Sequence, residues 1–217
     1  MGVAYNTSIV RDGLIFHLDA ANTKSYMGTG TDWNDLSPTR NTVTGGVFPT
    51  FLSTPPAMEF NGSTSSIQYP GLASVLTAAF TCESVIYLNT IPRGFTGLIY
   101  LGDFTGTYMD NEDFRIQSNG DNSSDLPVPL TVSTWYHTVA CFNPRNEYTL
   151  YVNGDLIATV PTTDNNIDIQ SPMQIGNRLP SDGVFDGRIA LAKVYNRPLT
   201  HQEVIQNFES IRGRFGL

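Results

Sequence analysis

The sequence is poor in charge, and in basic residues above all. Only 15% of its 217 residues are charged, and 12 Lys and Arg stand against 20 Asp and Glu, for a net charge of −8. Because binding to a phosphate backbone needs a basic surface, this balance excludes a nucleic-acid partner. An acidic surface favours solubility, and it suits divalent cations or a basic partner.

Long apolar runs are missing too, so the sequence predicts no membrane-spanning helix and no membrane insertion. The residues after Met1 have neither the basic start nor the apolar stretch of a signal peptide, which predicts synthesis in the cytoplasm. Cysteine is scarce. Cys82 and Cys141 each lie in an apolar, strand-like run, so we expect buried free thiols; a disulfide between them is the alternative.

Turn formers and aromatic residues are abundant. The chain contains 19 Gly, 13 Pro, 12 Phe and 10 Tyr, a composition typical of short strands joined by turns. A hydrophobic fraction of 40% is enough to bury a sizeable core and excludes a disordered chain. Since no repeat or linker-like segment divides the sequence, we expect one domain over residues 1–217.

Alternation of apolar and polar residues predicts an all-β chain. The most regular pattern is a hairpin over Asn146–Val160, with Asn153-Gly154 as its tight turn. Asn61-Gly62 is expected to join two short strands. Further strands are expected over Gly13–Ala20, Ala79–Asn89, Phe95–Asp103, Phe114–Ser118, Thr134–Asn143 and Met173–Asn177.

The segment Asp186–Phe208 changes its period halfway. Its first half is apolar at both parities, which predicts a central strand with Ile189, Leu191 and Lys193 on one face and Ala190, Ala192 and Val194 on the other. Thr200 and Glu203 then have the spacing of a capping box, which starts a helix. We expect Val204, Ile205 and Phe208 to form the buried face of that helix.

Five motifs in order resemble the laminin-G/pentraxin-like branch of the concanavalin A-like lectin/glucanase superfamily. They are an N-terminal part with GLIFHLDAAN, WNDLS and MEFNGSTSSIQY, then W-x-H-x-V at Trp135–Val139, LYVNG at Leu150–Gly154, I-G at Ile175-Gly176, and the segment Phe185–Glu203. The resemblance implies a two-sheet antiparallel jelly-roll sandwich with one short C-terminal helix. It also implies a packing role for Trp33.

The tail QNFESIRGRFGL and the leaderless start resemble stand-alone proteins of this family in tailed bacteriophages. This narrower resemblance implies a virion protein, assembled in the host cytoplasm, that decorates or cements a capsid or serves adhesion at a neck or tail fibre. Its partners would be other virion proteins, and host-surface glycans in an adhesion role; a homo-oligomer is compatible with either.

Some relatives in this superfamily are glycosidases with alternating carboxylates in one strand. Here the segment Asn166–Gln170 reads NIDIQ, with amides at both outer positions. Amides do not titrate, so they serve neither as nucleophile nor as general acid. The three histidines are far apart in sequence, and His137 reads as a strand residue. We therefore expect no enzymatic activity.

Many relatives bind calcium, and Ca²⁺ takes six to eight oxygen ligands. The candidate metal ligands are Asp103, Asp110, Asp113 and Asp186, with solvated turn carboxylates as the alternative. Sugar sites combine a stacking aromatic ring with Asn or Asp on loops at the rim. Tyr108, Asp110 and Asn111 are the candidates for carbohydrate binding.

The sequence thus favours a non-catalytic virion structural protein. The alternative is a calcium-dependent carbohydrate-binding lectin module, and a glycoside hydrolase ranks third.

Overall fold

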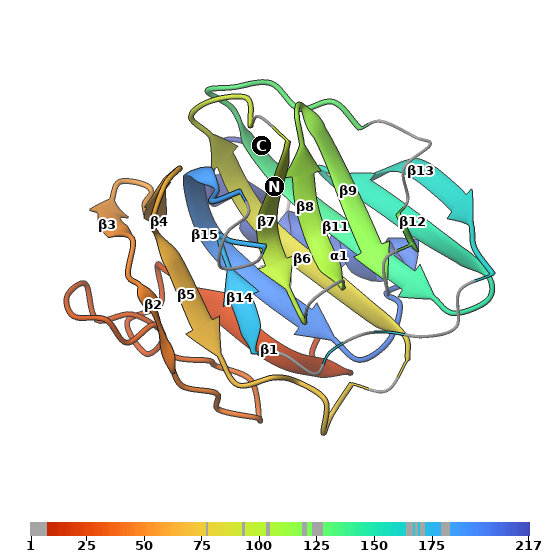
Figure 1. Cartoon of the computed structure of the whole chain (residues 1–217), viewed down its shortest axis with the longest axis horizontal. Coiled ribbons are helices and arrows are strands. Elements are labelled where there is room, and N and C mark those ends of the chain that lie inside the picture. The colour runs from red at the N-terminus through yellow and green to blue at the C-terminus, as the bar shows by residue number, and fades with distance from the viewer. Residues whose placement is uncertain are drawn as a thin grey trace, which may run out of the picture.

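The computed structural model describes residues 8–217 except 77, 93, 103–104, 119–120, 123–127, 164–166, 168, 170–171 and 179–182, with only the backbone of 121–122. Two antiparallel sheets lie face to face, and Figure 1 shows β7, β8 and β9 in front of β6 and β11. The all-β jelly-roll sandwich with one C-terminal helix is confirmed.

Sheet A has eight strands in the described part of the chain, in the order β13-β12-β11-β6-β15-β4-β3, and β1 also pairs with β15. Their bounds are β1 Leu14–Asp19, β3 Thr50–Ser53, β4 Pro56–Asn61, β6 Phe80–Leu88, β11 Trp135–Asn143, β12 Glu147–Val152, β13 Asp155–Pro161 and β15 Asp186–Tyr195. The hairpin β12–β13 is confirmed, since Val152 pairs with Asp155 and both Asn153 and Gly154 have positive φ.

Sheet B has seven strands among the described residues, in the order β10-β9-β8-β7-β14-β5-β2. Their bounds are β2 Gly45–Val47, β5 Ser66–Tyr69, β7 Phe95–Tyr100, β8 Gly106–Asp110, β9 Asp113–Ser118, β10 Asp121–Asn122 and β14 Met173–Ile175. The two strands expected around Asn61-Gly62 exist, but β4 belongs to sheet A and β5 to sheet B, so this turn carries the chain from one sheet to the other.

The main core fills the space between the sheets. It takes side chains from strands of both sheets, such as Phe80, Cys82 and Ile86 from β6 and Met109 from β8. Trp33 is completely buried in this core, which confirms its packing role. Cys82 and Cys141 are both buried free thiols, as expected.

Strand β15 departs from the simple alternation that the sequence predicts. Its pairing with β6 shifts register between Ile189 and Leu191, so Ala190 is an extra residue there. As a result Ile189 shares the main core with Ala192 and Val194, while Ala190 and Leu191 both pack on the opposite face of sheet A. The predicted split of these residues between two faces is therefore wrong at Ile189 and at Ala190.

Helix α1, His201–Ile211, covers the outer face of sheet A. The capping box is confirmed: Thr200 Oγ1 accepts from the backbone of Glu203, and the Glu203 carboxylate accepts from the backbone of Thr200. The buried face consists of Val204, Asn207 and Ile211, whereas Ile205 is 40% exposed, so its predicted burial is wrong. No helix in the described chain is long and apolar enough to cross a membrane.

Candidate functional site

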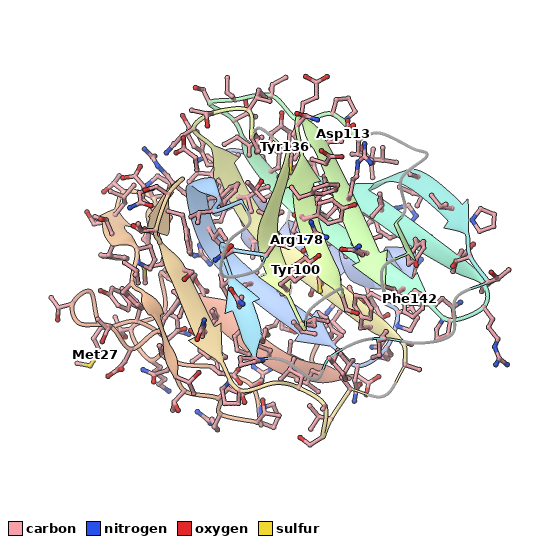
Figure 2. The ribbon with its side chains drawn as sticks, viewed as in Figure 1. Met27, Tyr100, Asp113, Tyr136, Phe142 and Arg178 are labelled. Atoms are coloured by element: carbon pink, nitrogen blue, oxygen red, sulfur yellow. The ribbon has the colours of Figure 1, made fainter. Side chains whose placement is uncertain are left out.

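Arg178, which follows β14, projects over the outer face of sheet B (Figure 2). Neighbouring residues of β7, β8 and β9 enter the core, so Tyr100, Tyr108 and Gln117 point away from it. Arg178 Nε donates to the Tyr100 hydroxyl at 2.7 Å, and that hydroxyl donates to Gln117 Oε1. Arg178 Nη2 lies 3.4 Å from the same Gln117 oxygen. The guanidinium is thereby held at a fixed place on the sheet.

Aromatic rings surround this guanidinium. Arg178 Cζ lies 4.6 Å from the centroid of Phe95, and 5.8 Å and 5.9 Å from those of Tyr100 and Tyr108. Phe95 is 42% exposed, and Arg178 is half-buried. We call Phe95, Tyr100, Tyr108, Gln117 and Arg178 the sheet B cluster. It presents one aromatic ring and part of one cation to solvent, a combination suited to a polar ligand with apolar faces.

Tyr108 is part of this cluster, but not in the expected way. Tyr108 is expected on a loop at the rim, whereas it lies within β8 with its side chain fully buried. Its ring packs 5.4 Å from Phe95, and burial raises the pKa of its hydroxyl to about 12. The expectation of an exposed stacking ring at Tyr108 is wrong, because β8 completes a sheet there. Phe95 holds the exposed position instead.

The candidate residues Asp110, Asn111 and Asp113 come together at the turn between β8 and β9. Asp110 and Asp113 are cross-strand partners, and Asn111 adopts the positive φ that this turn requires. Arg115 bridges the two carboxylates, with Nη1 3.4 Å from Asp110 and Nη2 3.2 Å from Asp113. A guanidinium therefore already compensates part of the negative charge that a calcium ion would need.

Asp186 lies apart from these residues, at the start of β15 in sheet A. It accepts hydrogen bonds from Thr90 Oγ1 at 2.8 Å and from Asn89 Nδ2 at 3.2 Å. Asp103 lies outside the described residues, as do Asn166 and Gln170 of the NIDIQ segment. Within the described part of the chain, no three His, Cys, Asp or Glu side chains form a metal-binding group. Calcium binding stays a prediction.

A second charged cluster lies between sheet A and helix α1, and we call it the helix-side network. The Glu83 carboxylate contacts Lys193 Nζ at 2.7 Å, His137 Nε2 at 3.1 Å and Asn207 Nδ2 at 2.6 Å. Asn207 Nδ2 also donates to the Tyr195 hydroxyl at 2.9 Å. All five side chains are completely buried, and His137 is a strand residue as expected. Without access to solvent, this network offers no site for a ligand.

Arg178, Gln117 and Phe95 are not among the site residues predicted from the sequence. Each comes from a different strand or connection, so no local motif links them. The one available signal is Arg178 two residues after the I-G motif, because basic residues are few in so acidic a chain. Their common location depends on the pairing of β7 with both β8 and β14, which local alternation does not specify.

The two packed sheets and the C-terminal helix define the class of this protein as a concanavalin A-like jelly roll. A family model, Laminin_G_3, described as concanavalin A-like lectin/glucanases superfamily, matches residues 61–205. The chain belongs to this family. No curated protein matches the sequence.

Solved structures share the fold at low identity. A Trypanosoma rangeli sialidase in complex with sialic acid has a TM-score of 0.64 at 20% identity, over 93% of this chain and 33% of that chain. The binding domain of Paraclostridial Mosquitocidal Protein 1 has a TM-score of 0.67 at 20% identity, over 91% of this chain and 52% of that chain. The binding domain of Botulinum Neurotoxin DC in complex with SialylT has a TM-score of 0.69 at 15% identity, over 93% of this chain and 52% of that chain. The chain thus spans a third to about half of these proteins.

Proposed function

We propose that this protein is a carbohydrate-binding module and that its sugar site is the sheet B cluster. The observation that carries the proposal is the half-buried Arg178, held by Tyr100 and Gln117 beside the exposed ring of Phe95. A sugar has apolar C–H faces and polar hydroxyl edges, so it needs an aromatic surface and fixed hydrogen-bond partners together.

The hydrogen-bonding capacity of Arg178 supports this role. A guanidinium has five N–H donors. Arg178 uses Nε and Nη2 toward Tyr100 and Gln117, and no described residue accepts a hydrogen bond from Nη1. Donors at Nη1 are therefore available to a ligand that stacks on Phe95. The membership of a lectin-type superfamily gives independent support, as does the similar neurotoxin binding domain in complex with SialylT.

A glycan array on the purified protein tests the proposal, with and without a calcium chelator. We expect selective binding that Phe95→Ala and Arg178→Gln each reduce at least about tenfold, since each removes a direct contact. Matched controls are Leu156→Ala, which truncates an exposed apolar side chain on edge strand β13, and Arg212→Gln on helix α1. An array without hits, or equal losses in both controls, would contradict the proposal.

The chelator arm separates the calcium-dependent lectin from a metal-independent one. Since Arg115 already contacts both Asp110 and Asp113, we expect binding to survive chelation. Loss of binding would instead favour calcium and point to the predicted carboxylates, Asp186 and Asp103 among them.

The virion role and the absence of catalysis stay predictions. A non-catalytic sugar-binding module fits an adhesion protein of a phage tail or capsid, because attachment requires binding without cleavage. Mass spectrometry of purified phage particles tests the virion role. Incubation with chromogenic glycosides tests the absence of catalysis. Particles without this protein, or release of the chromophore, would contradict the corresponding prediction.

A further inference from the structure

A basic pocket lies beside β1, a strand of sheet A, whereas the proposed sugar site lies on sheet B. It has a volume of about 580 Å³, within the usual range for small-ligand pockets. Its lining includes Arg11, His17, Lys24 and Arg40, with Leu14 and Leu36 on the apolar side, and it contains no Asp or Glu. In a chain with a net charge of −8, this concentration of cations is unusual. The whole lining precedes the matched residues 61–205.

His17 gives the pocket an unused buried hydrogen-bonding group. The side chain is only 9% exposed, and its Nε2 atom has no hydrogen-bond partner in the described structure. Burial, with the nearby charge of Lys193, lowers the pKa of His17 to about 4, so the imidazole is neutral at pH 7. A neutral imidazole still donates one N–H. An unpartnered buried polar atom costs free energy unless a ligand or water completes its hydrogen bond.

The pocket walls are held in place by the protein itself. The buried Asp35 carboxylate accepts from the His17 backbone N–H at 2.9 Å and from the Ser37 hydroxyl at 2.9 Å, which fixes the 35–41 loop along β1. The Leu36 backbone N–H donates to the His17 carbonyl. Asn22, another lining residue, accepts a hydrogen bond at Oδ1 from the Lys24 backbone N–H. Hydrogen bonds within the protein therefore hold the loops that carry Lys24 and Arg40 in place without a ligand.

The described carboxylates near the pocket form no salt bridge with the cations that line it. Asp19 is engaged in a two-bond pair with Arg214, at 2.8 Å and 3.0 Å. Asp35 is buried under its own hydrogen bonds. None of Arg11, Lys24 and Arg40 has a salt bridge in the described structure, whose ion pairs all involve other cations. Among the described residues, these three cations therefore have no salt-bridge partner.

We propose that this pocket binds an oxyanion group, with Arg11, Lys24 and Arg40 supplying positive charge and His17 Nε2 supplying a hydrogen bond. A carboxylate, sulfate or phosphate has the charge and acceptor geometry that guanidinium groups recognise. The group belongs either to an acidic sugar or to a free inorganic anion. The apolar side chains of Leu14 and Leu36 would contact the carrier of the group in the first case.

Isothermal titration calorimetry at constant ionic strength tests this site, with sodium sulfate, sodium phosphate and sodium glucuronate as probes and glucose as the neutral control. We expect binding of the anions with one site per chain and no binding of glucose. Arg11→Gln and Arg40→Gln should each weaken the affinity at least about tenfold, because each removes a charge-assisted contact. Arg212→Gln makes the same charge change outside the pocket and should leave the affinity unchanged.

Thermal melting of each variant shows that it is folded, and Lys24→Gln is the substitute if one of the arginine variants is not. Glucuronate binding at least tenfold tighter than sulfate or phosphate assigns the site to an acidic sugar; the reverse order assigns it to a free anion, and both support the oxyanion site. No binding of any anion at millimolar concentration, or equal weakening by Arg212→Gln, overturns it. Phe95→Ala leaves this pocket intact, so failure of the sheet B proposal is seen separately.

Discussion

Two charged clusters lie on the outer faces of the two sheets, and their hydrogen bonds are completed to different degrees. In the helix-side network, Glu83 is matched by Lys193, His137 and Asn207, and all of them are fully buried. In the sheet B cluster, Arg178 is half-buried and has donors to spare. The first arrangement pairs its charges internally, out of reach of solvent, and serves stability. The second keeps donors of Arg178 free for the proposed ligand.

The electrostatics of Glu83 show how tightly the first cluster is closed. Burial alone would raise the pKa of this carboxyl, but the positive charge of Lys193 and the contact with His137 outweigh burial and lower the pKa to about 2. A buried ion pair of this kind adds little over an apolar pair, yet the loss of one partner leaves an unpaired buried charge. Substitutions that remove one partner should therefore show the largest difference in stability between the two clusters.

The largest expected effect is that of Glu83→Gln. It leaves the Lys193 ammonium buried without a counter-charge, so we expect a loss of about 3–5 kcal/mol in the free energy of unfolding, measured by urea denaturation at pH 7. The control Glu209→Gln breaks an exposed pair with Arg212 and should cost less than about 1 kcal/mol. Recovery of stability by Glu83→Leu combined with Lys193→Met would confirm the electrostatic cause. Equal losses for both single variants would contradict it.

A decrease in pH is expected to have an intermediate effect on the free energy of unfolding. The folded-state pKa of His17, about 4, lies below its ordinary value of 6.5, so stability falls as the pH drops from 6.5 to 4 while only the unfolded chain takes up that proton. The pKa of Glu83, about 2, lies below its ordinary value of 4.5, so a second loss runs from pH 4.5 to 2. Urea denaturation across this range measures both losses.

The variant His17→Gln separates the two acid stages. It should remove most of the loss between pH 6.5 and 4 and leave the loss below pH 4.5. A flat stability between pH 6.5 and 3 in the unsubstituted protein would show that neither group is perturbed in the folded state.

The smallest expected effect on stability is that of Arg178→Gln, the same variant that should abolish most sugar binding. Its guanidinium is partly solvated, so we expect a change below about 1 kcal/mol in urea denaturation. A loss as large as that of Glu83→Gln would make the sheet B cluster a structural network like the first, and the contrast between the two faces would disappear.

Local patterns in the sequence were sufficient for much of the fold. The Asn153-Gly154 turn and the Thr200–Glu203 capping box are encoded by a few adjacent residues, and both are confirmed. Strand β8 was missed because Gly106–Asp110 is short and polar at its ends. The bulge at Ala190 was missed because its cause is the register with β6, which is a property of two strands.

The sites depended on long-range pairing and were predicted only in part. Asp110, Asn111 and Asp113 do come together, since they belong to one turn. Glu83 and Lys193 are charged residues in strands that are buried over most of their length. Their sequence separation of 110 gave no local sign that they pair. Arg178 and Phe95 offered no comparable signal. Where a site is assembled from several strands, its members become recognisable only once strand order is known.

The position of β15 affects the order in which the strands can pair while the chain is being synthesised. This strand is the last in the chain, yet it lies inside sheet A, with β6 on one side and β4 and β1 on the other. In the described chain β1 pairs with no other strand, so its backbone has no partner before β15 has been synthesised. Pairing over such sequence distances is slow, because the loop must close before the contacts form. Strand β1 therefore stays without a partner strand until β15 is available.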